Sequence, residues 1–82
     1  MTVILPQNIY NQFSTCLPDK LEEEISRTSI RLKLQEPPKA DEERIIYQQE
    51  LDRLSALKYL SQLRKGKLSP DEFALKVKLI PS

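Results

Sequence analysis

Several residue types on which many enzymes depend are missing or nearly missing from these 82 residues. There is no histidine, so Ser–His and Cys–His catalysis and every histidine-containing metal site are excluded. There is a single glycine, Gly66, which is too few for a phosphate-binding P-loop or a dinucleotide fingerprint. We therefore expect no enzymatic activity, no cofactor, no metal ion and no small-molecule substrate.

Cysteine and long apolar runs are also scarce. The only cysteine, Cys16, has no partner for an internal disulfide, so the fold does not depend on an oxidising compartment. A reactive thiol there would need activation by a lysine, an arginine or a helix N-terminus, and simple packing is the favoured interpretation. No segment approaches the roughly 20 apolar residues of a membrane span, and the N-terminal residues lack the basic region of a signal peptide. These features predict a protein that is cytoplasmic, or assembled in the cytoplasm, without membrane contact.

The charges are balanced overall but unevenly placed. Lysine and arginine number 13 and aspartate and glutamate 12, and this net charge of +1 is too small to make the whole molecule a binder of polyanions. No acid occurs between Asp52 and Asp71, so this stretch is locally basic. Its candidate nucleic-acid contacts are Arg53, Lys58, Arg64, Lys65 and Lys67. Acids on the same expected helix weaken that field, so a solvated polar face is the favoured interpretation.

Proline and charge patterns divide the chain into four segments and predict an all-α fold. Proline lacks an N–H and disfavours helix at the preceding residue, so each proline marks an expected boundary. The segments are an N-terminal arm with a short helix at 1–17, a helix at 18–36, a proline linker at 37–40 and an αα-hairpin at 41–80. We therefore expect a small helical domain with a C-terminal αα-hairpin and an extended N-terminal arm.

The first half of the chain carries the weaker signals. Ile9 and Phe13 recur at helical spacing and indicate the short helix. Asp19 followed by Glu22 fits a capping box at the start of the next segment. Residues 29–34 alternate polar and apolar side chains, so the end of this helix fits an edge strand as well, and both alternatives stay open.

The expected hairpin has clearer start and stop signals. Its first helix opens with acids at residues 41–43, where Asp41 is the expected cap and capping is favoured over binding of a divalent ion. Gly66 supplies a left-handed residue just beyond that helix. Ser69 then caps a second helix, followed by Pro70 in its first position, and this helix is expected to extend to residue 80.

Leucines recur at every third position of the first hairpin helix, and the stripe they form winds around it. The series consists of Leu51, Leu54, Leu57, Leu60 and Leu63. Because each step of three falls back by roughly 60°, Leu60 lies opposite Leu51. Such a helix must be covered on more than one side, either by residues 9–34 of the same chain or by a partner. In the second case the predicted partner-binding residues are Leu54, Leu57, Leu60 and Tyr59.

A glycine turn and an acid–Phe pair follow the leucine series. Beside the leucines, the motif consists of Gly66, Leu68, Glu72, Phe73, Lys76, Leu79 and Ile80. Over residues 51–80 this arrangement resembles the short C-terminal domain known as SHOCT. Members of that family usually lie at the ends of larger proteins and are thought to mediate oligomerisation, with nucleic-acid association sometimes proposed. The resemblance therefore implies a helical hairpin that associates with protein.

Two functions fit these patterns. We expect a non-enzymatic protein–protein interaction or oligomerisation module whose partner is another protein or a second copy. Small accessory subunits of larger assemblies, including phage structural or regulatory proteins, are often built in this way, although that is an argument by analogy. The alternative is a DNA-associated regulator or an antitoxin-like dimer that uses the basic end of the long helix.

Overall fold

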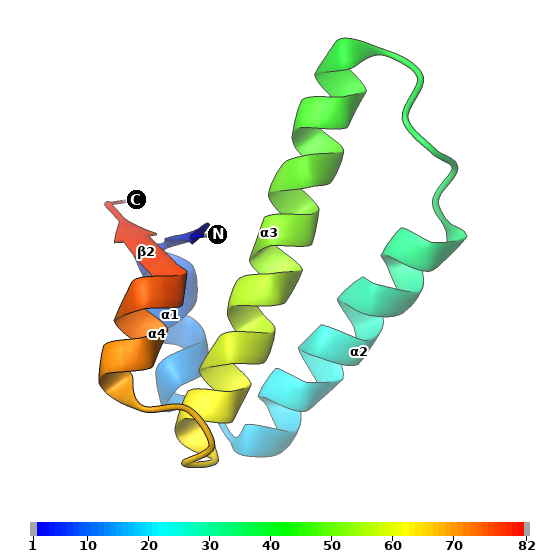
Figure 1. Ribbon diagram of the computed structural model, residues 1–82. Coiled ribbons are helices and arrows are strands. Elements are labelled where there is room, and N and C mark those ends of the chain that lie inside the picture. The colour runs from blue at the N-terminus through cyan, green and yellow to red at the C-terminus, as the bar shows by residue number, and fades with distance from the viewer. Residues whose placement is uncertain (1, 82) are drawn as a thin grey trace.

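The computed structural model describes residues 2–81, which are mostly helical, with a small sheet that joins the two ends of the chain (Figure 1). The elements are β1 (Val3–Pro6), α1 (Gln7–Thr15), α2 (Pro18–Leu34), α3 (Asp41–Arg64), α4 (Pro70–Lys76) and β2 (Val77–Ile80). β1 and β2 pair in parallel, with Val3 opposite Val77 and Leu5 opposite Leu79. The expectation of an all-α fold is therefore wrong at both ends of the chain, which are strands.

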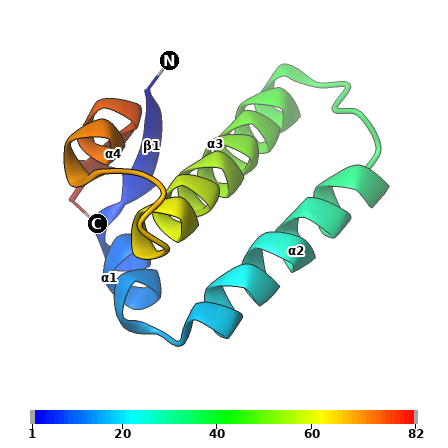
Figure 2. The same cartoon turned by 60° about the horizontal axis from the view of Figure 1, so that its bottom comes forward.

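The long helix α3 is central, and the other elements cover two of its sides. α2 runs antiparallel to α3 along one side and is joined to it by residues 35–40 (Figure 1). α1, α4 and the sheet lie on the other side, against the C-terminal half of α3 (Figure 2). The N-terminal half of α3 extends past the sheet, and the molecule is accordingly elongated, measuring 38 × 24 × 22 Å.

The expected extended arm at the N-terminus is a strand that pairs within the chain. Alternation along β1 turns Leu5 inward, where it is completely buried, and leaves Ile4 about half exposed. On β2 the same alternation buries Val77 and exposes Lys78. Parallel strands need a crossover of a dozen or more residues, and the four helices between β1 and β2 supply it. The arm therefore closes the fold and does not reach out along a neighbour.

Two of the predicted helix caps are wrong. α2 begins with Pro18 in its first turn and α3 begins after Ala40, and neither helix has a side-chain cap. Asp19 and Asp41 lie instead inside the first turns, where a negative charge interacts favourably with the helix dipole. Residues 29–34 are helical, so the alternative of an edge strand is excluded.

The chain leaves α3 through the turn that its sequence predicts. Gly66 has a φ of +77°, in the left-handed region. Its N–H donates to the carbonyl oxygen of Leu63 over 3.1 Å, and the N–H of Lys67 donates to the carbonyl oxygen of Gln62 over 2.9 Å. These two bonds form a Schellman motif, which satisfies carbonyls that the helix end would otherwise leave free.

The second of these C-terminal helices starts as predicted and ends early. The Ser69 hydroxyl accepts a hydrogen bond from the backbone N–H of Glu72 over 3.2 Å, with Pro70 in the first helical position. The helix ends at Lys76, however, and Val77 continues as a strand. The expectation that it extends to residue 80 is therefore wrong, because residues 77–80 pair with β1.

The core lies where α3 meets the sheet, α4 and the start of α2. It consists of Leu5, Leu21, Ala56, Leu57, Leu60, Leu68, Phe73 and Val77. From α1, Ile9, Tyr10 and Phe13 pack against this cluster, and the rings of Tyr10 and Phe73 lie 6.1 Å apart between centroids. The winding leucine stripe of α3 is thus covered on both sides by the same chain.

Candidate functional site: the exposed face of the long helix

The leucines predicted to contact a partner lie inside the chain. Leu54, Leu57 and Leu60 are only 7%, 1% and 1% exposed. Tyr59 is half-buried, and the ammonium group of Lys76 lies 5.5 Å from the centre of its ring. Of the two alternatives that the sequence left open, cover by the same chain is the one found, because α2 and the sheet cover opposite sides of the helix. The expectation that these leucines contact a partner is therefore wrong.

Exposed apolar side chains occur instead on the N-terminal half of α3. Ile45 and Ile46 are 61% and 59% exposed, although both are large and β-branched. The sheet packs against the C-terminal half of α3, so it does not cover these two turns (Figure 1). Isolated exposed apolar residues are ordinary, and what matters is whether these two belong to a larger surface.

A groove of about 320 Å³ connects this part of α3 to the outer face of the sheet. The residues that line it are Ile4, Pro6, Gln49, Asp52, Arg53 and Ile80. Steps of about 100° per residue place Ile45 on the same side of α3 as Gln49 and Asp52. The isoleucines of the helix and of the sheet therefore belong to one surface. We call this surface, formed by Ile4, Ile45, Ile46, Gln49 and Ile80, the α3–sheet face.

Opposite charges stand at the two ends of the α3–sheet face. Glu42 precedes the isoleucines and Arg53 follows them, and the two lie within about 20° of each other around the helix axis. Both side chains are exposed, and neither makes an ion pair with any residue between 2 and 81. Arg44, on the opposite side of the helix, does have a partner, since its Nη1 lies 3.9 Å from Asp41 Oδ1.

Arg64, a candidate nucleic-acid contact, is used within the chain. Its Nη1 donates to the carbonyl oxygen of Phe13 over 2.9 Å and lies 3.6 Å from the Sγ of Cys16. Phe13 is in the last turn of α1, where carbonyl oxygens lack helical partners. Arg64 therefore caps α1 and holds it against α3, and Cys16 packs beside this contact.

Three of the other basic candidates gather around an acid. Lys58, Lys65 and Lys67 line one shallow hollow together with Glu22. Lys65 Nζ lies 2.6 Å from a carboxylate oxygen of Glu22, which also accepts a hydrogen bond from the Ser61 hydroxyl. These two bonds hold the pKa of Glu22 below its ordinary value of 4.5, and the bond from Lys65 has the larger effect. An ionised carboxylate thus lies among these lysines, and it would repel an approaching phosphate.

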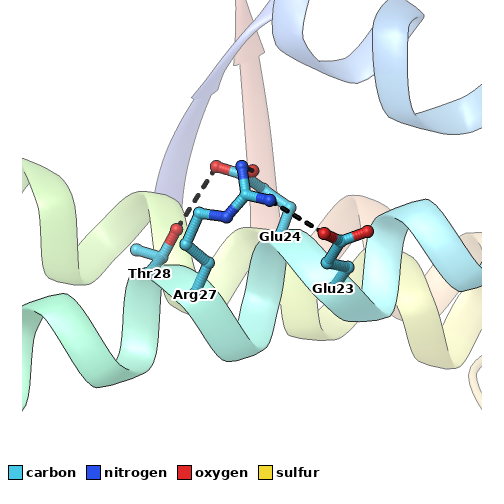
Figure 3. Close-up of polar contacts among 4 residues, drawn as sticks. All are labelled: Glu23, Glu24, Arg27 and Thr28. Atoms are coloured by element: carbon cyan, nitrogen blue, oxygen red, sulfur yellow. Dashed lines mark hydrogen bonds and ion pairs between the residues drawn. The ribbon is translucent and has the colours of Figure 1, made fainter.

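Two further acids of α2, Glu23 and Glu24, find partners on their own helix. Arg27 lies 2.8 Å from Glu23 and 3.9 Å from Glu24, and the Thr28 hydroxyl donates to Glu24 over 3.4 Å (Figure 3). Across residues 2–81 no three acidic or cysteine side chains are arranged to hold a metal ion. In the same part of the chain no helix is both long and apolar enough to cross a bilayer.

Ile45 and Ile46 were not among the predicted partner-binding residues, because their signal in the sequence is weaker than that of the leucine series in the second half of α3. The signal for them is the acid-rich first turn followed by Glu42, Ile46, Gln49 and Arg53 at intervals of four, three and four. That spacing places the four side chains on one side of a helix. The contributions of Ile4 and Ile80 had no local signal, since they depend on the pairing of the two strands.

Comparison with known proteins identifies no relative: no family model, no curated protein and no solved structure matches this chain. The features that indicate a function are therefore the α3–sheet face and the charges that flank it.

Proposed function

We propose that this protein is a non-enzymatic association module that binds a protein chain through the α3–sheet face. The observation that carries the proposal is that two isoleucines of α3, 61% and 59% exposed, precede a groove between α3 and the sheet that Ile4 and Ile80 help to line. Burying such a surface yields roughly 25 cal/mol per Å² of apolar area. Contiguous apolar surface on a small monomer marks a site of interaction.

The role we propose is that of a small accessory subunit of a larger assembly. A phage particle is one example of such an assembly. The resemblance of residues 51–80 to SHOCT domains supports a function in protein association, since those domains are thought to mediate oligomerisation. The surface proposed here differs from the one that the leucine series suggested, because it lies before that series on α3 and includes both strands.

Contact with nucleic acid has weaker support. Arg64 is held by α1, and Lys65 is paired with Glu22, whose charge opposes the lysines around it. Nucleic-acid binding would be favoured over protein binding if the chain bound duplex DNA, if that affinity fell steeply with salt, and if it disappeared in a variant that carries both Lys58→Glu and Lys67→Glu.

Photo-cross-linking tests the proposed function. A photoreactive amino acid replaces Ile46 in one variant and Ile30 in the other, and both are expressed in the cell that makes the protein. Ile30 is the matched control, because it is 58% exposed but lies on the outer side of α2. We expect a discrete covalent adduct from position 46 and none from position 30. Adducts from neither position, or equally from both, would contradict the proposal.

A further inference from the structure

We infer that the occupant of the α3–sheet face is a second copy of this chain, related by a two-fold axis that sets the two α3 helices antiparallel. The inference rests on the proposed function and names its partner. It follows from the order of side chains along the face, from the charges at its ends and from the surface area of the single chain.

The spacing along α3 fits a helix against a helix. Glu42, Ile46, Gln49 and Arg53 recur at intervals of four, three and four, which is the spacing of the contact positions in paired helices. A two-fold axis between residues 47 and 48 places Ile46 of each copy against Gln49 of the other. Ile45 of each copy then lies toward the groove that contains Ile4 and Ile80, so the sheet extends the contact beyond the helices.

The charges select the antiparallel arrangement. About the same axis, Glu42 of each copy faces Arg53 of the other, which gives two equivalent ion pairs at the ends of the contact between Ile46 and Gln49. A parallel arrangement would set Glu42 against Glu42 and Arg53 against Arg53. Complementary charges at the rim of an interface fix its orientation and register, and like charges placed opposite each other reject the alternative. Both side chains are available, since neither has an ion-pair partner among residues 2–81.

The surface of the single chain is large for its mass. A compact monomer of 9.6 kDa is expected to expose about 5,100 Å², whereas this chain exposes 6049 Å². The excess of about 950 Å² is of the same order as the ~800 Å² that each partner buries in an interface of standard size. The N-terminal half of α3, which extends past the sheet, contributes to this excess (Figure 1).

A charge swap tests the arrangement in the full chain. Sedimentation and light scattering measure the mass, and we expect twice the chain mass of 9.6 kDa at high concentration. Glu42→Arg alone and Arg53→Glu alone each create two like-charge contacts, so each should raise the dissociation constant of the dimer by about tenfold. Both changes together restore the ion pairs in the opposite sense and should bring the constant back to within about threefold of the original.

Two matched controls separate the interface from general effects of charge. Arg44→Glu makes the same change in charge on the opposite side of α3 and should leave the dissociation constant unchanged. Ile46→Glu should abolish the dimer, whereas Ile30→Glu, at an equally exposed isoleucine of α2, should leave it intact. Circular dichroism of each variant verifies that the helices are retained.

The outcomes distinguish this inference from the proposed function. A chain that stays monomeric at all concentrations overturns the inference, and the proposed function survives if position 46 still cross-links to a different protein. A dimer in which the double charge reversal fails to rescue the single ones also overturns it. A dimer that Ile30→Glu disrupts and Ile46→Glu does not would overturn the inference, and the absence of any cross-link from position 46 would then overturn the proposed function as well.

Discussion

Arg64 shows how a residue with two plausible roles in the sequence acquires a third in the structure. Near the end of α3 its charge suits the helix dipole, and next to other cations it suits a phosphate. In the fold it donates to the carbonyl oxygen of Phe13 and attaches α1 to α3. A variant such as Arg64→Glu would therefore weaken the packing of α1, so a loss of binding in that variant would not identify Arg64 as a contact.

Glu22 should make the free energy of unfolding depend on pH. Its bonds to Lys65 and Ser61 lower its pKa below 4.5 in the folded chain. A lowered carboxyl pKa contributes stability that is present above the unfolded value and lost as pH falls through the folded value. We expect the difference in free energy of unfolding between the natural chain and Glu22→Gln to be largest near pH 7 and to shrink below pH 4.5. Urea titrations across this range measure it.

Glu36→Gln is the control for this experiment, because Glu36 is exposed and belongs to none of the ion pairs between residues 2 and 81. A difference that stayed constant with pH for Glu22→Gln would show that the bonds to Lys65 and Ser61 do not contribute to stability.

Gly66 is required for its backbone conformation and not for lack of space. A Cβ at this position would meet no atom within 4 Å, but the φ of +77° is costly for any residue with a side chain. Gly66→Ala should therefore lower the free energy of unfolding by about 1 kcal/mol, and Gly66→Asn by less, because asparagine tolerates the left-handed region better. Thermal unfolding of the two variants measures the difference, and equal losses would contradict the conformational explanation.

Among the elements, β1 gives the sharpest test of the fold. Leu5 is completely buried and Ile4, its neighbour in sequence, is 49% exposed on the opposite face. Leu5→Ala should cost about 2–5 kcal/mol of folding free energy, whereas Ile4→Ala should cost about 1 kcal/mol or less. Chemical denaturation compares the two. Similar small effects would mean that residues 3–6 form a loose arm, as the sequence alone predicted.

Local signals predicted that most of this chain is helical and predicted how α3 ends and α4 begins. The turn at Gly66 and the cap at Ser69 follow from side-chain chemistry that acts over three or four residues. In each case the residues that determine the structure are close together in the sequence.

The sheet could not be predicted in the same way. β1 and β2 are four residues each, and Val3 pairs with Val77 at the other end of the chain. Neither segment indicates its partner, and the second one continues directly from α4. The part of the α3–sheet face that the strands contribute was unpredictable for the same reason, because Ile4 and Ile80 come together only when the strands pair. The winding leucine stripe showed that α3 needs cover on two sides, and it left residues 9–34 and a partner as alternatives. α2 and most of α1, which lie within residues 9–34, supply part of that cover, and the sheet, which the sequence did not predict, supplies the rest.

At the scale of the whole molecule, the main cluster of buried residues lies at one end. The core joins the C-terminal half of α3 to the sheet, α4 and the start of α2. The other end holds the linker at residues 35–40 and the exposed Ile45 and Ile46. The end with the full core thus continues into the pair of α2 and α3, on which Ile45 and Ile46 stay exposed, so the association that we propose need not disturb the fold.

The parallel pairing of the terminal strands also governs how the chain responds to tension. Because β1 and β2 run in the same direction, the N-terminal end of β1 and the C-terminal end of β2 lie at opposite ends of their hydrogen-bonded ladder. A pull on the two ends of the chain loads the bonds of the ladder together, in shear, whereas an antiparallel pair would unzip one bond at a time. The small sheet therefore acts as a mechanical clamp. Tension between the two ends of the chain would have to break this ladder before it could unfold the helices between the strands.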